Sequence, residues 1–456
     1  MNSAFPELFN RTVIKATSAL HAIAVAAVMR RLASVAGGGD LYDRWDVSVK
    51  AGAAELDYRN AANTFGYVVE IDPYNKSSRA RKRTALGRFA HESAAVSLAV
   101  EGKPLAFYMG DDSRNEYLYK YVSAAAWQAS DASAMDRLAV GDKYLDNGKL
   151  YVAKFNANGT GEWIELTISN PQIQAYGAYA FADQGDVCIH SRLAADAVGA
   201  TKMDRPEWCS AHPGTGEIYF TLTNNSNRRA APSSSSQAAV DAANPRAYTD
   251  MKGSTTQSGN VNGHIIRLAE ADANPASLTF KWDIYLFGAE AGADEATINL
   301  SGLTAADDFS SPDGLWFSPK TGVCWIQTDD GAFTDVTNCM MLAALPGKIG
   351  DGGNVTLTYN VSGGTKSVTT PVGKKAAEST LKRFLVGPSG CEVTGVAETP
   401  DGKTLFINIQ HPGEETAVAD LGTPAKYASH WPDGGSARPR SGTVVITKDD
   451  GGVIGS

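Results

Sequence analysis

From about residue 62 onward the chain is a succession of short apolar segments separated by turns. Aromatic and β-branched residues alternate with polar ones inside many of these segments, which is typical of half-buried strands. Gly, Asp, Asn and Pro cluster between the segments, as they do in tight turns. The sequence therefore predicts an all-β fold. The predicted strands are 65–71, 105–109, 116–122, 150–155, 162–168, 217–223, 263–269, 279–287, 323–328, 405–410 and 443–448.

Helical patterns are confined to three short stretches, 12–31, 124–140 and 236–243. A doubly wound α/β sheet needs a helix between most of its strands, so the pattern excludes that class.

Four of the predicted strands run directly into polar or acidic residues. These strands begin near 107, 219, 324 and 405, a spacing of about two blades for a β-propeller whose blades take roughly 40–50 residues. If each is the inner strand of a blade, their polar ends meet in one axial channel. The alternative is that strand ends generally meet turns rich in Asn, Asp and Gly. The polar residues concerned are Asp111-Asp112, Asn224-Asn225, Asp329-Asp330 and His411.

Composition narrows the possible partners. The 456 residues include 41 Lys+Arg and 50 Asp+Glu, a formal net charge of −9, and 43% are hydrophobic. This apolar content excludes a largely disordered chain, and the acidic balance argues against nucleic acid as the main partner. No uninterrupted apolar run reaches about 18 residues, so we expect no membrane-spanning helix. Because no long hydrophobic surface stripe is evident, we expect a monomer.

The N-terminal region differs from the rest of the chain. Residues 18–29 are apolar and helix-prone, but Arg30 and Arg31 follow this run, whereas a signal peptide carries its charges before the apolar run. We therefore expect 1–45 to be a leader or short helix, and 46–456 to form one propeller domain.

Three polar clusters could hold a cation or an oxyanion. Carboxylate-rich, sulfur-poor clusters suit hard cations such as calcium, and an adjacent arginine suits a phosphate or carboxylate group. Each cluster also has a structural interpretation, namely a strand-end pair, a turn cap and a salt-bridge network. The clusters are His91-Glu92, Asp111-Asp112 and Asp204-Arg205-Pro206-Glu207; Asp313 lies in a Pro-Asp-Gly turn.

The same segments resemble the PhoX-type alkaline phosphatases, which are exported, metal-dependent phosphomonoesterases built on a β-propeller. The similar strings follow one order along about 62–414. They include FGYVVEIDP (65–73), KRTALGRFAHE (82–92), YMGDDSRNEYLYKYVS (108–123), TKMDRPEW (201–208), CWIQTDDG (324–331) and TPDGKTLFINIQHPGE (399–414).

This resemblance implies a centre of calcium and iron ions held by carboxylates near the propeller axis, acting on a small-molecule phosphate ester. Glu92, Asp111 and Glu207 match metal ligands of the family, and Arg205 matches an arginine that contacts the oxyanion. The family also implies a periplasmic or extracellular location. Further residues in or beside the matching strings, with no role assigned, are His91, Asp112, Asp204, Asn224, Asp313 and His411.

The chain departs from the family at its N-terminus, because residues 1–45 show nothing like the segment that precedes this region in the family. The propeller is therefore expected to be either incomplete or closed in another way. Three functions remain open at this point: a phosphomonoesterase, a non-catalytic calcium- or phosphate-binding propeller, and a propeller lactonase or phosphotriesterase with one axial calcium.

Overall fold

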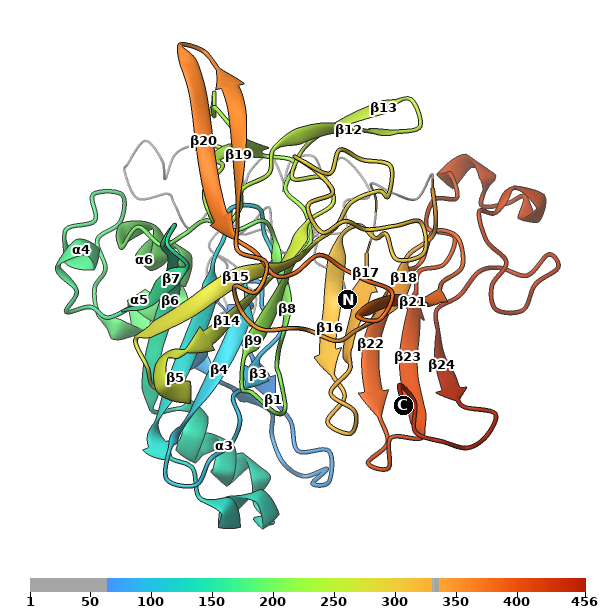
Figure 1. Ribbon diagram of the computed structural model, residues 1–456. Coiled ribbons are helices and arrows are strands. Elements are labelled where there is room, and N and C mark those ends of the chain that lie inside the picture. Colours follow the sequence, from blue (N-terminus) through green and yellow to red (C-terminus); the bar gives the residue numbers. More distant parts are fainter. Residues whose placement is uncertain (1–63, 330, 332–335) are drawn as a thin grey trace, which may run out of the picture.

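The computed structural model describes residues 64–329, 331 and 336–456 (Figure 1). The predicted helix at 12–31 and the predicted leader 1–45 lie outside these residues. Within them strands dominate, and they form the blades of a β-propeller, so the predicted all-β class is confirmed.

The strands that follow residue 94 form four successive antiparallel blades. The first blade holds β3 (Ala95–Val96), β4 (Pro104–Gly110), β5 (Leu118–Ala126), β6 (Gly148–Phe155) and β7 (Thr160–Glu165). The second blade holds β8 (Pro206–Ala211), β9 (Ile218–Leu222), β14 (His264–Glu270) and β15 (Thr279–Phe287). The third blade holds β16 (Pro312–Phe317), β17 (Cys324–Thr328), β18 (Met340–Ala344) and β21 (Leu381–Val386), and the fourth holds β22 (Glu392–Glu398), β23 (Thr404–Gln410) and β24 (Gly442–Thr447).

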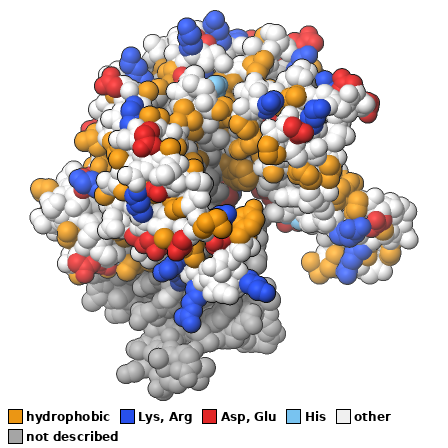
Figure 2. All heavy atoms as spheres, turned by 90° about the horizontal axis from the view of Figure 1, so that it is seen from below, with side chains coloured by type: hydrophobic (Ala, Val, Ile, Leu, Met, Phe, Trp, Pro, Cys, Tyr) orange, Lys and Arg blue, Asp and Glu red, His pale blue; other side chains and the backbone are white. Residues whose placement is uncertain are grey.

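The inner edges of the blades lie side by side: β3 and β4 contact β8, β8 contacts β16, and β16 contacts β22, so that the blades follow one another in an arc (Figure 1). The first two blades join into one nine-stranded sheet, because their outer strands β7 and β15 pair. Seen from below, the molecule is hollowed between the two sides of the arc, and apolar side chains gather on one wall of the hollow (Figure 2).

Strand alternation explains how the blades pack together. In β9, Tyr219 packs between the second and third blades, whereas its neighbour Phe220 packs between the first and second. In β17, Ile326 and Trp325 divide in the same way between the two faces of the third blade. Because successive side chains point to opposite faces, a strand covered on both sides is apolar at consecutive positions.

The inner-strand hypothesis is wrong for all four strands on which it was based. β4, β9, β17 and β23 are each the second strand of a blade, because β3, β8, β16 and β22 lie at the inner edges. They run antiparallel to these inner strands. Residues that follow a second strand therefore lie at the same end of the blade as those that begin the inner strand.

The helices are short and lie mostly outside the first blade. They are α3 (Arg137–Leu145), α4 (Pro171–Gln174), α5 (Gln184–Ile189) and α6 (Ser191–Ala197). The helix predicted at 124–140 overlaps only the start of α3. The helix predicted at 236–243 is wrong: this stretch contains β11 (Ala238–Ala239), which pairs in parallel with β10 (Arg228–Arg229).

Two hairpins project beyond the blades, at the top of Figure 1. They are β12 (Tyr248–Lys252) with β13 (Thr255–Gly259), and β19 (Asn354–Val361) with β20 (Gly364–Pro371). A further small pair precedes the first blade, β1 (Val69–Glu70) with β2 (Arg81–Lys82). Short 3-10 turns occupy Thr84–Leu86, Ala129–Ser133, Ala271–Ala273, Val418–Asp420 and Pro424–Lys426.

One glycine permits the close approach of the first two blades. A Cβ atom on Gly110, the last residue of β4, would lie 2.3 Å from the backbone oxygen of Glu207 in β8. Only glycine fits such a contact, so the end of β4 lies directly against Glu207. No helix in the described part of the chain is long and apolar enough to cross a membrane.

Candidate active site

Acidic side chains converge where the inner strands begin. Glu207 is the second residue of β8, Asp313 the second of β16 and Glu392 the first of β22. Glu92 precedes β3, and its backbone N–H donates to Gly110 O at the end of β4 (3.3 Å). Because the inner strands lie next to one another, residues more than 100 positions apart in sequence share one end of the arc.

Glu92, Glu207 and Asp313 form the first cluster. One carboxylate oxygen from each lies within 4.8 Å of the others. Glu207 and Asp313 are buried, with 2% and 7% of their surfaces exposed. Burial, followed by the charge of Asp112, raises the pKa of Glu92 to about 7. Burial, together with neighbouring carboxylates, also raises the pKa values of Glu207 and Asp313 well above their usual range.

Asp329, Glu392 and His411 form a second cluster, with candidate ligand atoms again within 4.8 Å of one another. His411 Nε2 lies 3.5 Å from Glu392 Oε2. Hydrogen bonding to Glu392 raises the pKa of His411 to about 9, whereas burial raises that of Asp329 to about 6. Gln410 Nε2 donates to Glu392 Oε2 at 2.7 Å and so orients this carboxylate.

The two clusters share one electrostatic environment. After burial, the charges of Glu392 and Asp329 in the second cluster are what raise the pKa of Asp313 in the first. Arg205 lowers the pKa of Glu92 and Glu207 but does not offset the other effects. Several buried carboxylates around one guanidinium leave an excess of negative charge, and buried charges are normally paired or coordinate metals. The donor set is oxygen-rich and free of sulfur, which fits a hard cation such as calcium.

Arg205 lies beside the first cluster and is held by two acidic groups. Its Nε lies 2.9 Å from Asp112 Oδ1, and its Nη2 lies 3.1 Å from Asp112 Oδ2 and 3.0 Å from Glu207 Oε1. The side chain keeps 19% of its surface exposed. A guanidinium that is fixed on one side and partly open on the other suits the binding of a phosphoryl oxygen.

Unusual backbone conformations occur around the same groups. Arg205 (φ 55°), Ser311 (φ 50°) and His411 (φ 38°) are all non-glycine residues with positive φ. Each adjoins the start of an inner strand or the end of a second strand. Such conformations cost of order 1–3 kcal/mol each and cluster at functional sites.

Asp111 lies away from the two clusters, although it matched a metal ligand of the family. It is fully buried and pairs with Arg192 of α6, whose Nε donates to Asp111 Oδ2 at 2.7 Å. Its neighbour Asp112 contacts Arg205 instead. His91 stacks on Phe89 with ring centroids 3.7 Å apart, and burial lowers its pKa to about 4.

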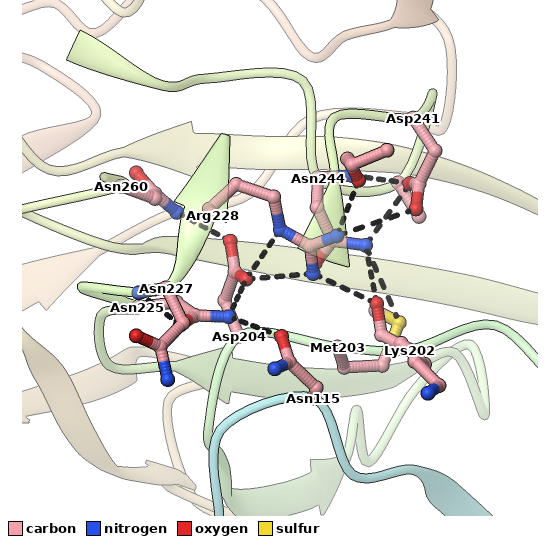
Figure 3. A network of polar contacts seen from close by, with 12 residues as sticks. Asn115, Lys202, Met203, Asp204, Asn225, Asn227, Arg228, Asp241, Asn244 and Asn260 are labelled. Atoms are coloured by element: carbon pink, nitrogen blue, oxygen red, sulfur yellow. Dashed lines mark hydrogen bonds and ion pairs between the residues drawn. The ribbon is translucent and has the colours of Figure 1, made fainter. Parts of the chain in front are cut away.

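Asp204 belongs to a structural network, as Figure 3 shows. Its carboxylate accepts hydrogen bonds from Arg228 Nε (2.8 Å), Asn225 Nδ2 (2.7 Å) and Asn260 Nδ2 (3.0 Å). It is fully buried and satisfied by these donors. The salt-bridge interpretation therefore holds for Asp204, while Arg205 and Glu207 in the same motif face the acidic clusters. Asn224 donates weakly to Ser311 Oγ (3.4 Å), and its role stays a prediction.

Sequence reasoning missed Glu392 and named Asp329 only as a polar strand end. Glu392 begins β22 in the string GCEVTG, just as Glu207 follows the start of β8. No strand was predicted at 206–211, 312–317 or 392–398, so the acidic residues at the starts of these strands gave no positional signal in the sequence.

Comparison with known proteins identifies the family. A family model described as "Alkaline phosphatase PhoX" matches residues 9–413. The chain belongs to the PhoX alkaline phosphatase family. The match begins at residue 9, so the expectation that the similarity starts near residue 62 was wrong.

A solved structure supports the same assignment. Pseudomonas fluorescens PhoX, in complex with vanadate as a transition state analogue, is 36% identical to this chain, with a TM-score of 0.67. The alignment covers 88% of this chain and 61% of that one, so this PhoX relative spans about three fifths of the solved chain. No curated protein matches the chain.

Proposed function

We propose that this protein is a metal-dependent phosphomonoesterase whose centre lies at the two acidic clusters. The observation that supports this most strongly is the excess of buried carboxylates around one partly open guanidinium. Such an arrangement is unfavourable unless cations occupy it. The structure of Pseudomonas fluorescens PhoX with vanadate, a phosphoryl mimic, supports the phosphoryl-transfer chemistry.

Residues of this chain divide into holding and binding roles. Glu92, Glu207 and Asp313 would hold a calcium ion through carboxylate oxygens. The second cluster adds the imidazole of His411, a donor that iron accepts more readily than calcium does. When bound, these cations supply Lewis-acid stabilisation of charge on the phosphoryl oxygens.

Arg205 would bind the phosphoryl group directly. Asp112 holds its Nε and Nη2, so the guanidinium enters the reaction already oriented and little reorganisation is needed. Glu207 belongs to the first cluster and also contacts Arg205, so it would set the distance between the oxyanion site and the cation site. The family is typically secreted, and we place this protein in the periplasm or outside the cell, as a monomer.

A substrate panel tests this proposal. We expect the purified protein, supplied with calcium and iron, to hydrolyse an aryl phosphate monoester, and to act much less on an aryl phosphate triester or a lactone. Hydrolysis of the triester or lactone alone would point instead to a one-calcium propeller hydrolase.

A non-catalytic role is the second candidate, because the same buried carboxylates would hold calcium without any reaction taking place. In that case calcium would raise the melting temperature without any turnover. A protein that binds calcium but shows no turnover with any combination of metals would support the non-catalytic role.

A further inference from the structure

A short strand pair carries two of the side chains that the proposed function requires. Asp112 N donates to Ala90 O (2.9 Å), Glu92 N donates to Gly110 O (3.3 Å), and His91 and Asp111 form an antiparallel bridge. The segments 90–92 and 110–112 are therefore paired along their length. We call this pair the acidic bridge.

Alternation assigns the side chains of the acidic bridge to two faces. His91 and Asp111 are directly opposite each other and share one face, because paired residues project to the same side. Glu92 and Asp112 follow them and therefore project to the other face. The contacts agree, since Asp111 binds Arg192 in the interior whereas Asp112 binds Arg205 at the site.

Arg192 fixes the inner face of the bridge. Its Nε and Nη2 donate to the two oxygens of Asp111, and Nη2 also lies 3.4 Å from Ser113 Oγ. Asp111 Oδ1 accepts a further hydrogen bond from Ala90 N (3.2 Å). One carboxylate thus joins α6 to both segments of the bridge, in a place where Arg192 keeps 2% of its surface exposed and Asp111 none.

We propose that Arg192 is a positioning residue for this site: its bidentate contact with Asp111 sets the acidic bridge and thereby the positions of Glu92 and Asp112. This inference rests on the proposed function. Arg192 touches neither cluster, so sequence motifs around the site do not reveal it. Its effect reaches the cation site through Glu92 and the oxyanion site through Asp112 and Arg205.

The bidentate geometry makes Arg192→Lys an informative variant. Lysine retains the positive charge, but its single ammonium cannot match both carboxylate oxygens in one plane. We expect calcium to bind about tenfold more weakly to the chelator-treated variant than to wild type, as for other residues that orient metal ligands. We also expect KM for an aryl phosphate monoester to rise several-fold, because Asp112 no longer holds Arg205 in place.

Arg83→Lys is the matched control. Arg83 is equally buried, with 1% exposed, and contacts Glu70, Asp142 and Asp146 far from the acidic clusters. We expect it to lower the melting temperature but to leave calcium affinity and KM unchanged.

Calorimetric titration of wild type and both variants with calcium alone, together with their kcat and KM values, tests whether Arg192 positions the site. Equal calcium affinity and KM in wild type, Arg192→Lys and Arg83→Lys would overturn the inference. If Arg192→Lys does not fold, Asp111→Asn provides the same test, because it removes one carboxylate oxygen and keeps the side-chain size. A wild type that neither binds calcium nor hydrolyses the ester would instead refute the proposed function.

Discussion

Replacing Glu207 by glutamine should stabilise the metal-free protein and weaken its response to calcium. Glu207→Gln keeps the size and shape of a side chain that is 98% buried, and removes its charge. Because the charge is unfavourable without a cation and needed with one, the change has opposite effects in the two states. A purely structural glutamate would not behave in this way.

The magnitude follows from the geometry. Candidate ligand oxygens of Glu92 and Asp313 lie within 4.8 Å of one from Glu207. At an effective dielectric constant of about 20, each such pair repels by at least about 3 kcal/mol. Arg205, at 3.0 Å, offsets about 5 kcal/mol of this roughly 7 kcal/mol. The raised pKa values keep part of these carboxyl groups protonated and so relieve part of the repulsion. We therefore expect the metal-free variant to be more stable by up to about 1–2 kcal/mol, a rise in melting temperature of up to about 1–4 °C.

Thermal unfolding at pH 8, with and without calcium, is the assay. Wild type should gain stability from calcium, and the variant should need at least about tenfold more calcium for the same gain. The rate at which the variant hydrolyses an aryl phosphate monoester should fall along with its affinity for calcium. A variant that is less stable than wild type without metal and has the same calcium dependence would refute this role for Glu207.

Glu270→Gln is the matched control. Glu270 is a buried glutamate away from the clusters, and it accepts hydrogen bonds from Lys120 Nζ (2.9 Å), Tyr108 OH (2.8 Å) and Trp163 Nε1 (3.0 Å). Removal of its charge leaves Lys120 buried without a counter-ion, which costs about 3–5 kcal/mol. We expect this variant to lose stability in both states and to keep its calcium dependence.

Three further predictions concern the same region. Arg205→Lys should raise KM for an aryl phosphate about tenfold in steady-state kinetics, since one ammonium cannot replace the guanidinium fork; an unchanged KM would remove Arg205 from the oxyanion site. Chelator-treated protein should lose stability as pH rises from about 4.5 through 7, because folded Glu92, with a pKa of about 7, keeps a proton that the unfolded chain has lost. Protonated His411, with a pKa of about 9, extends this loss of stability from pH 6.5 through 9. Calcium should reduce the part of the pH dependence that comes from Glu92. A melting temperature that does not change between pH 4 and pH 10 would contradict the raised pKa values of both groups. Gly110→Ala should cost about 1–3 kcal/mol in denaturant unfolding, because its Cβ would meet the Glu207 backbone; unchanged stability would show that β4 and β8 can separate freely.

The sequence predicted the strands whose local signal is strong, but it missed the inner strands β8, β16 and β22. The segments 279–287 and 105–109 correspond closely to β15 and β4, where apolar residues and flanking turns agree. The stretch 236–243 was misread because its four alanines favour a helix. There the backbone instead pairs with Arg228–Arg229, a contact that composition does not show.

The site was only partly predictable, because side-chain direction depends on register. Glu92, Glu207 and Arg205 lie at the clusters, as the motifs indicated. Asp111 and Asp112 are adjacent, however, and only the pairing of His91 with Asp111 determines which of them faces the site. Glu392 lies in the fourth blade, and its proximity to Asp313 arises from the packing of β16 against β22.

Elemental analysis of the purified protein is the most direct test of the central idea that buried carboxylates gather here to hold cations. We predict at least two bound metal ions per chain, one for each cluster, with calcium among them, and loss of both metal and turnover after chelation. Full hydrolysis of a phosphate monoester by protein that contains no metal would contradict this account.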